Sequence, residues 1–257
     1  MDVYVCHYTP NIDRRLYLQA QGIEARFITD YDRETLDVKQ IESWNHYQEA
    51  SNVFSRIAPT LLANIICLNQ NTANFRGAFA SASRFLDNGN DRERFLSGLV
   101  KPLTPSETSL FYKHLMAMKY IAESSRAYGV VIEDDCIFPH DAISSIKAIL
   151  SKYGHLYDYI DLAGGAGLTP ARTDQCFDAG CGRKLYTVIP PRTRTTCAFS
   201  ISRRFAKLLV THLTNPIAPI DHMLTYLAQE FAMDVAWCEP PPLVHGSEVG
   251  AYRSNLR

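Results

Sequence analysis

The sequence predicts an α/β fold in which helices flank a mostly parallel central sheet. Short apolar runs rich in β-branched and aromatic residues alternate with amphipathic helix patterns over the whole chain, as expected of repeated strand–helix–strand units. With 257 residues, the chain has room for one large core or two small ones. We take a single domain over residues 1–257 as the simpler expectation.

The N-terminal part shows the first such unit. The runs "DVYVCHY" (2–8) and "EARFITDY" (24–31) predict strands, and "NIDRRLYLQAQG" (11–22) between them predicts a helix that ends at Gly22. This order favours a right-handed parallel crossover. Residues 32–100 are polar and lean toward helix, so we expect a helical insertion there, with an exposed loop at "LDNGNDRER" (86–94).

The clearest helix begins in "LTPSETSLFYKHL" (103–115). Thr104 is a good N-cap, Pro105 suits the first helical position, and Glu107 completes a capping box. His114 shares an apolar face with Leu110, Phe111, Leu115, Met118 and Ile121 at helical spacing. A buried, hydrogen-bonded histidine is therefore favoured over one that contacts an acceptor.

Strand and helix patterns continue to alternate after this helix. The stretch "GVVIEDD" (129–135) predicts a strand, and the C-terminal half predicts a helix at 142–154, a strand at 157–165, a strand turning into a helix at 197–213, a helix after "NPIAPIDHML" (215–224) and a last strand at 233–239.

Composition narrows the class of protein. The formal net charge is −1, from 26 Lys and Arg against 27 Asp and Glu, which argues against a nucleic-acid partner. No apolar run of about 18 residues or signal-peptide pattern is visible. The seven cysteines are an odd number and scattered, as expected for free thiols in a reducing compartment. We therefore expect a cytoplasmic protein. The spacing of Cys176 and Cys181 does not favour a zinc site.

Three adjacent acids, Glu133, Asp134 and Asp135, follow the apolar run of residues 129–132. In open α/β sheets, ligands bind beyond the carboxyl ends of the strands. Adjacent carboxylates repel one another unless a cation or hydrogen-bond donors compensate them. Their oxygens suit Mg²⁺ or Mn²⁺, with the phosphates of a nucleotide completing the coordination. A solvent-exposed turn is the alternative, and the preceding strand shifts the balance toward a ligand site.

His245 is a second candidate ligand. It lies in "PPPLVHGSEVG" (240–250), after the last predicted strand. A neutral imidazole binds Mn²⁺ well and can close a site opposite Asp135. The alternative is an ordinary exposed loop histidine.

Several stretches together resemble the glycosyltransferase family 25 enzymes, which are bacterial lipopolysaccharide-type sugar transferases. The family signature "LTPxE…SH" followed by "vlEDD" is similar to "LTPSETSLFYKHL" and "GVVIEDD" here. Further on, "TCAFSISRRFAKLL" (196–209) and "APIDHML" (218–224) resemble the family's "aYiiSr.gA..Ll" and "PvD..l". The resemblance is good over residues 100–225 and weak over 30–98. Lys113 stands where the family usually has Ser, and Phe199 where it has Tyr.

The resemblance implies a GT-A fold, a Rossmann-like arrangement that binds a nucleotide sugar through an acidic motif and Mn²⁺ or Mg²⁺. It implies transfer of a hexose, from a UDP-sugar such as UDP-galactose, to a hydroxyl of a glycan acceptor in surface polysaccharide or lipopolysaccharide biosynthesis. Because the acceptors of such enzymes are often lipid-linked, the resemblance also implies that the protein could associate peripherally with the cytoplasmic face of the inner membrane.

Roles for single residues follow from the pattern and the resemblance. Asp135 is the leading metal ligand, Asp134 a second ligand or a ribose contact, and Glu133 a structural acid at the strand end. Asp221 is the candidate base that deprotonates the acceptor hydroxyl, with an N-cap role as the alternative. An inverting displacement is then expected, and a retaining reaction is the alternative.

The remaining candidates concern the donor. His7, Tyr8, Thr9 and Asp30 follow the first two strands and are expected to contact the nucleoside. Gly164 and Gly165 in "AGGAG" either let the backbone approach the donor sugar or form a tight turn. Arg192 and Arg194 suit phosphates or acidic sugars, although a solvated loop is the favoured interpretation.

Two other functions use the same residues. A nucleotidyltransferase or phosphohydrolase also needs clustered acids and a metal. A homologue that binds nucleotide sugar or glycan without turnover is the non-enzymatic alternative, favoured only by Lys113 and by the divergent N-terminal half.

Overall fold

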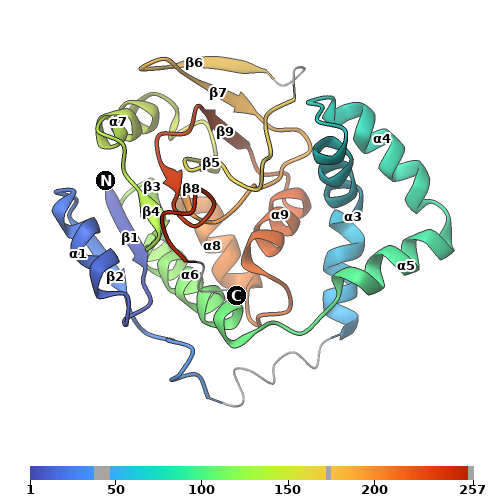
Figure 1. Cartoon of the computed structure of the whole chain (residues 1–257), viewed down its shortest axis with the longest axis horizontal. Helices are drawn as coiled ribbons and strands as arrows, with labels where there is room; N and C mark the ends of the chain where they lie inside the picture. Colours follow the sequence, from blue (N-terminus) through green and yellow to red (C-terminus); the bar gives the residue numbers. More distant parts are fainter. Residues whose placement is uncertain (38–46, 172–174, 254–257) are drawn as a thin grey trace.

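The computed structural model describes residues 1–37, 47–171 and 175–253, with only the backbone described at positions 47 and 48. Strands and helices alternate along the chain, as the sequence predicts (Figure 1). In chain order the elements are β1 (Asp2–Cys6), α1 (Ile12–Ala20), β2 (Ala25–Ile28), α3 (Tyr47–Asn69), α4 (Phe75–Leu86), α5 (Gly89–Leu99), α6 (Pro105–Glu123), β3 (Tyr128–Glu133), β4 (Cys136–Ile137), α7 (Ala142–Tyr153), β5 (Tyr159–Asp161), β6 (Cys176–Gly180), β7 (Arg183–Thr187), β8 (Ala198–Ser202), α8 (Arg203–His212), α9 (Ile220–Glu230), β9 (Val235–Glu239) and β10 (Val244–His245).

Among the described residues, the central sheet has eight strands in the order β2-β1-β3-β8-β5-β9-β7-β6. Six of them, β1, β2, β3, β5, β6 and β9, run in one direction, and β7 and β8 run against it. The arrangement is a mixed, mostly parallel α/β sheet, compatible with a Rossmann-like fold. The register pairs Cys6 with Ile28 on one side and with Glu133 on the other, so β1, β2 and β3 end at the same edge.

Both faces of the sheet are covered, because successive strand residues point to opposite faces. Val131 packs into the larger core with residues of α3, α6, α8 and α9. Val130 and Ile132 point the other way, into a second core with α7 and Leu18 of α1. Burial on both faces explains why β3 reads as a continuous apolar run.

The helical insertion consists of α3, α4 and α5 in its described part, and residues 38–46 of the expected insertion lie outside the described residues. Figure 1 shows these three helices together on one side of the molecule. The expected loop at 86–94 is wrong, because Asn88 caps α5 by accepting a hydrogen bond from the Asn90 amide at 3.1 Å. No residue of α5 is fully buried, but Leu96 and Leu99 are partly buried and pack against the larger core.

One described helical stretch, Glu49–Asn69, is long and apolar enough to cross a membrane by length and composition alone. A core helix of a globular protein passes the same test. Val53, Phe54 and Ile57 of this stretch are buried in the larger core. These apolar side chains therefore have packing partners within the protein.

The capping box at the start of α6 is confirmed. The Thr104 hydroxyl accepts a hydrogen bond from the Glu107 amide at 3.2 Å, and the Glu107 carboxylate accepts one from the Thr104 amide at 2.7 Å. Because α6 runs beneath the strand ends, this box fixes the start of the helix that supports the site.

We expect Thr104→Ala to lower the free energy of unfolding by about 1 kcal/mol, since the cap hydroxyl satisfies an otherwise unpaired helix amide. Urea denaturation followed by circular dichroism measures the change. Ser97→Ala, which removes an exposed hydroxyl within α5, is the control and should stay within about 0.5 kcal/mol of wild type. Equal effects of the two substitutions would contradict the capping role.

Candidate active site

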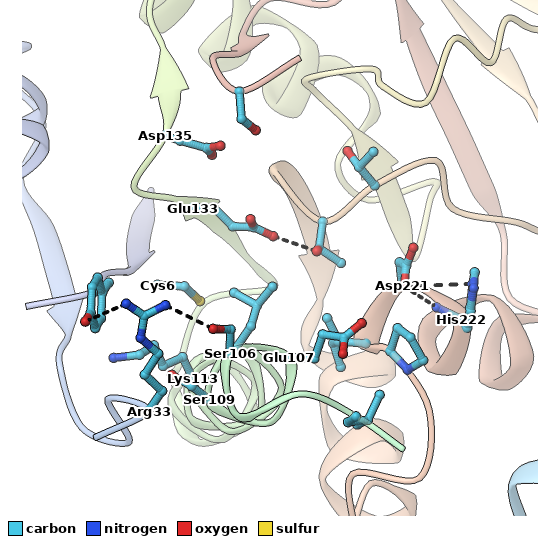
Figure 2. A pocket seen from close by; sticks show the side chains of 18 of the residues that line it. Cys6, Arg33, Ser106, Glu107, Ser109, Lys113, Glu133, Asp135, Asp221 and His222 are labelled. Atoms are coloured by element: carbon cyan, nitrogen blue, oxygen red, sulfur yellow. Dashed lines mark hydrogen bonds and ion pairs between the residues drawn. The ribbon is translucent and has the colours of Figure 1, made fainter. Parts of the chain in front are cut away.

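A cavity of about 500 Å³ opens beyond the carboxyl ends of β1 and β3, a volume typical of small-ligand sites. Its polar wall includes Tyr8, Arg33, Glu133, Asp135, Asp221 and His245. Figure 2 shows Asp135 and Glu133 on one side and Asp221 on the other, with Glu107 of α6 between them and slightly below Asp221 in this view. The acids that follow β3 therefore lie at a cavity, where the sequence predicted a ligand site.

Asp134 lies in a cage of hydrogen-bond donors. One oxygen faces the His7 ring at 3.0 Å, the Tyr8 amide at 2.9 Å and the Asn11 amide group at 3.2 Å, and the other accepts from Arg14 at 2.8 Å. Burial would raise the pKa of Asp134, but the donors, led by His7, lower it below its usual value. This carboxylate joins the end of β3 to the loop after β1 and to α1.

His7 belongs to this support and is fully buried. Its carbonyl accepts a hydrogen bond from the Lys113 ammonium at 2.7 Å, and the same ammonium contacts Asp32 at 2.7 Å. Lys113 thus ties together the loops that follow β1 and β2. Lys113, which stands where the family that the sequence resembles usually has Ser, has a structural role here.

Glu133 and His114 form a second supported pair. The Glu133 carboxylate accepts from the Thr196 hydroxyl at 2.6 Å and lies 3.3 Å from His114 Nε2. His114 is fully buried and stacks on Phe199, which confirms the prediction of a core histidine. Burial opposes a charged ring, yet the Cys6 side chain and the Glu133 carboxylate raise the pKa of His114 to about 10.

Asp135 pairs with His245. The short antiparallel pairing of β4 with β10 sets His245 opposite Cys136, and this brings His245 Nε2 to 3.3 Å from Asp135 Oδ2. The two residues therefore meet as the sequence predicted. Burial raises the pKa of Asp135 and lowers that of His245, but their mutual attraction prevails, so the acid's pKa is lowered and the imidazole's is raised.

Gly246 makes this approach possible. Its amide donates to the Asp135 carbonyl at 3.0 Å. A Cβ at this position would lie 2.4 Å from that carbonyl oxygen and 2.5 Å from the ring of Tyr252. Contacts that short do not occur in folded proteins, so only glycine permits the strand that carries His245 to lie against Asp135.

Tyr8 and Arg33 form the wall beside the acids. The Tyr8 hydroxyl donates to Glu34 at 2.5 Å and accepts from Arg33 at 3.0 Å, and the guanidinium lies 4.6 Å from the ring centroid. Arg33 also donates to the Ser106 hydroxyl at 3.2 Å (Figure 2). Sequence reasoning missed Arg33, although its position soon after the second strand was a usable signal.

The other predicted donor contacts lie elsewhere. Thr9 and Asp30 are exposed and are not among the described residues that line the cavity. Gly164 and Gly165 have positive φ values of 69° and 128° and form a turn behind the wall, where Thr195 donates to the Gly164 carbonyl at 2.8 Å. The tight-turn alternative fits their position.

The expectation of a solvated loop at Arg192 and Arg194 is wrong, because both side chains are buried. Arg194 pairs with Asp161 at 2.7 Å and also with Glu239. Arg192 lies 3.5 Å from the centroid of the Phe75 ring. Carboxylates and aromatic faces compensate the two guanidinium groups inside the protein, and neither belongs to the cavity wall as described.

Asp221 lies in the first turn of α9, whose N-cap is Pro219. The N-cap alternative is therefore wrong. Its carboxylate accepts the His222 amide at 2.9 Å, and 33 % of the side chain is exposed. A negative charge in the first turn of a helix interacts favourably with the helix dipole. The Asp221 carboxylate faces the cavity from the side opposite Asp135 (Figure 2).

In metal-free protein, the His245–Asp135 pair predicts a pH-dependent stability. The folded-state pKa of His245 is raised above its ordinary value of 6.5, so its contribution is fully present below about pH 6.5 and is lost as the pH rises through the raised value. We expect His245→Gln to destabilise the protein more at pH 6 than at pH 9, as measured by urea denaturation in the presence of a chelator. A pH-independent difference between the two proteins would contradict the pairing.

Comparisons with known proteins leave the family open. No family model matches the chain, and no curated protein matches it. The functional inference therefore rests on the residues and the geometry of the cavity.

Proposed function

We propose that the protein is a metal-dependent glycosyltransferase that moves a hexose from a nucleotide sugar to a hydroxyl of a glycan acceptor. The observation that carries this proposal is the meeting of Asp135 and His245, from distant parts of the chain, at 3.3 Å on the wall of a cavity that also holds Asp221. The carboxylate and imidazole at one end of the cavity suit the sugar donor. The second carboxylate, at the other end, suits the acceptor.

The residues fit a divalent ion. Asp135 offers a carboxylate oxygen and His245 an imidazole nitrogen, a donor set that suits Mn²⁺. His245 Nε2 is the nitrogen beside Asp135, and it also lies 3.0 Å from the Ser247 hydroxyl. The buried Nδ1 has no hydrogen-bond partner among the described residues, although a Glu248 oxygen lies 3.6 Å away. The bound ion would neutralise charge on the leaving diphosphate. Because Asp134 is held by its own donors, we assign it to support rather than to the metal.

Tyr8 and Arg33 supply the expected chemistry for the nucleotide. An aromatic ring provides a stacking surface for a base, and a guanidinium matches phosphate oxygens in charge and shape. A uridine diphosphate sugar such as UDP-galactose is the donor that we propose. The GT-A arrangement belongs to the same proposal, supported by the mostly parallel sheet and by acids at the end of its central strand.

Asp221 is the proposed base for the acceptor. Its carboxylate is partly exposed to the cavity and is not consumed by an ion pair with a lysine or arginine among the described contacts. It would take the proton of the acceptor hydroxyl as that oxygen attacks the sugar carbon. Attack from the side opposite the leaving diphosphate gives inversion. A lipid-linked acceptor and a cytoplasmic site at the inner membrane complete the proposal.

We expect Asp135→Asn to lower sugar transfer more than about 100-fold, because it removes the charged metal ligand. Product glycan and released nucleoside diphosphate are measured with UDP-sugars and Mn²⁺. Asp178→Asn, an exposed acid on β6, is the matched control and should transfer as wild type does. Diphosphate release that does not depend on an acceptor would indicate a phosphohydrolase instead.

Asp221→Asn should lower kcat by about 10²- to 10⁴-fold, the usual contribution of a general base, while leaving donor binding intact. Calorimetry with the UDP-sugar and Mn²⁺ measures binding, and single-turnover assays measure chemistry. A kcat within a few-fold of wild type would remove Asp221 from the mechanism, and weakened donor binding would assign it to the donor instead.

A further inference from the structure

A thiol lies beside the Asp135–His245 pair. The Cys197 sulfur is 4.0 Å from Asp135 Oδ1. One ligand atom from each of Asp135, Cys197 and His245 lies within 4.8 Å of the others. Sequence reasoning placed Asp135 and His245 at the site but did not place Cys197 there.

The backbone fixes Cys197 in this place. It immediately precedes β8, which runs antiparallel to β3, and its carbonyl accepts the Glu133 amide at 2.7 Å. The side chain is 1 % exposed, so it is held in the protein interior beneath the acids. A second thiol, Cys136, is also fully buried and lies close to Cys197.

The spacing suits a small tetrahedral ion. Zinc binds oxygen and nitrogen at about 2.0–2.2 Å and sulfur at about 2.3 Å, which separates tetrahedral ligand atoms by roughly 3.3–3.6 Å. His245 Nε2 lies 3.3 Å from Asp135 Oδ2, which is within this range. The Cys197 sulfur lies 4.0 Å from the other carboxylate oxygen, Oδ1, so a small shift of the thiol toward the pair would bring it into the range. Asp135 and His245 line the cavity, so a fourth position would face a ligand there.

We propose that Cys197 is a third ligand, and that with Asp135 and His245 it forms a site that prefers a thiophilic divalent ion, Zn²⁺ or Co²⁺, over Mg²⁺ and Mn²⁺. Thiolate is a soft ligand that favours zinc and cobalt, whereas Mg²⁺ and Mn²⁺ are best served by oxygen. Three protein ligands with one open position are the pattern of catalytic zinc sites. The inference rests on the metal site of the proposed function and adds the ion's identity.

Cobalt reports directly on the sulfur. Chelator-treated full-length protein is titrated anaerobically with Co²⁺, without donor or acceptor. We expect an intense thiolate-to-cobalt charge-transfer band in the near ultraviolet, which Cys197→Ser abolishes. Cys136→Ser is the matched control, because it removes the neighbouring buried thiol that lies outside the ligand set, and it should keep the band.

Competition between ions gives a second measurement. Cys197→Ser should weaken Zn²⁺ binding by at least about tenfold and change Mn²⁺ binding far less, as measured by calorimetry. Thermal unfolding of the metal-free variants checks that each is folded. Absence of the charge-transfer band in the wild-type protein, its loss in Cys136→Ser alone, or equal weakening of both ions in Cys197→Ser would overturn the proposal.

The outcomes separate this inference from the proposed function. A cobalt band that depends on Cys197, in a protein that transfers no sugar, would support the metal site and remove the glycosyltransferase. Sugar transfer supported by Mn²⁺, in a protein that never shows the band, would keep the enzyme and remove the sulfur ligand.

Discussion

Compensation of three adjacent negative charges at the end of β3 is the constraint on which the rest of the site depends. Carboxylates taken out of water are costly unless partners offset the loss of hydration. Each acid meets this demand with a different set of groups. Asp134 takes donors from the loop after β1 and from α1, Glu133 takes Thr196 and His114, and Asp135 takes His245. Segments from all parts of the chain are thereby fixed at one edge of the sheet.

Asp134 and Asp135 differ in how many hydrogen-bond donors surround their carboxylates. A carboxylate that accepts four hydrogen bonds, as Asp134 does, has little capacity left for a ligand. Asp135 instead faces the His245 imidazole at 3.3 Å and lines the cavity. Lys113 extends the support by joining the loops that follow β1 and β2. Gly246 lets the strand that carries His245 lie against Asp135. A hydrogen-bonded framework next to a pair that lines the cavity is the arrangement expected of a preorganised site.

The two sides of the cavity carry different chemical groups. Its Asp135 side carries an imidazole and, nearby, the Tyr8–Arg33 stack, so it suits an anionic and aromatic ligand. Its other side is formed by the start of α9 and carries Asp221. Helix α6 runs between them and is fixed at its first turn by the capping box. The distance between the two chemical groups is thus set by the packing of α6 against the sheet and α9.

Local sequence determined the α/β alternation, the capping box of α6 and the position of the acids at a strand end, because periodicity, caps and strand length depend on neighbouring residues. It also indicated that His245 belongs with Asp135. Only the tertiary structure decided that β8 runs antiparallel between β3 and β5, that Arg192 and Arg194 are buried, that Asp134 is enclosed by donors, and that Cys197 lies beside Asp135. These features arise from contacts between residues far apart in the chain, and no local pattern records such contacts.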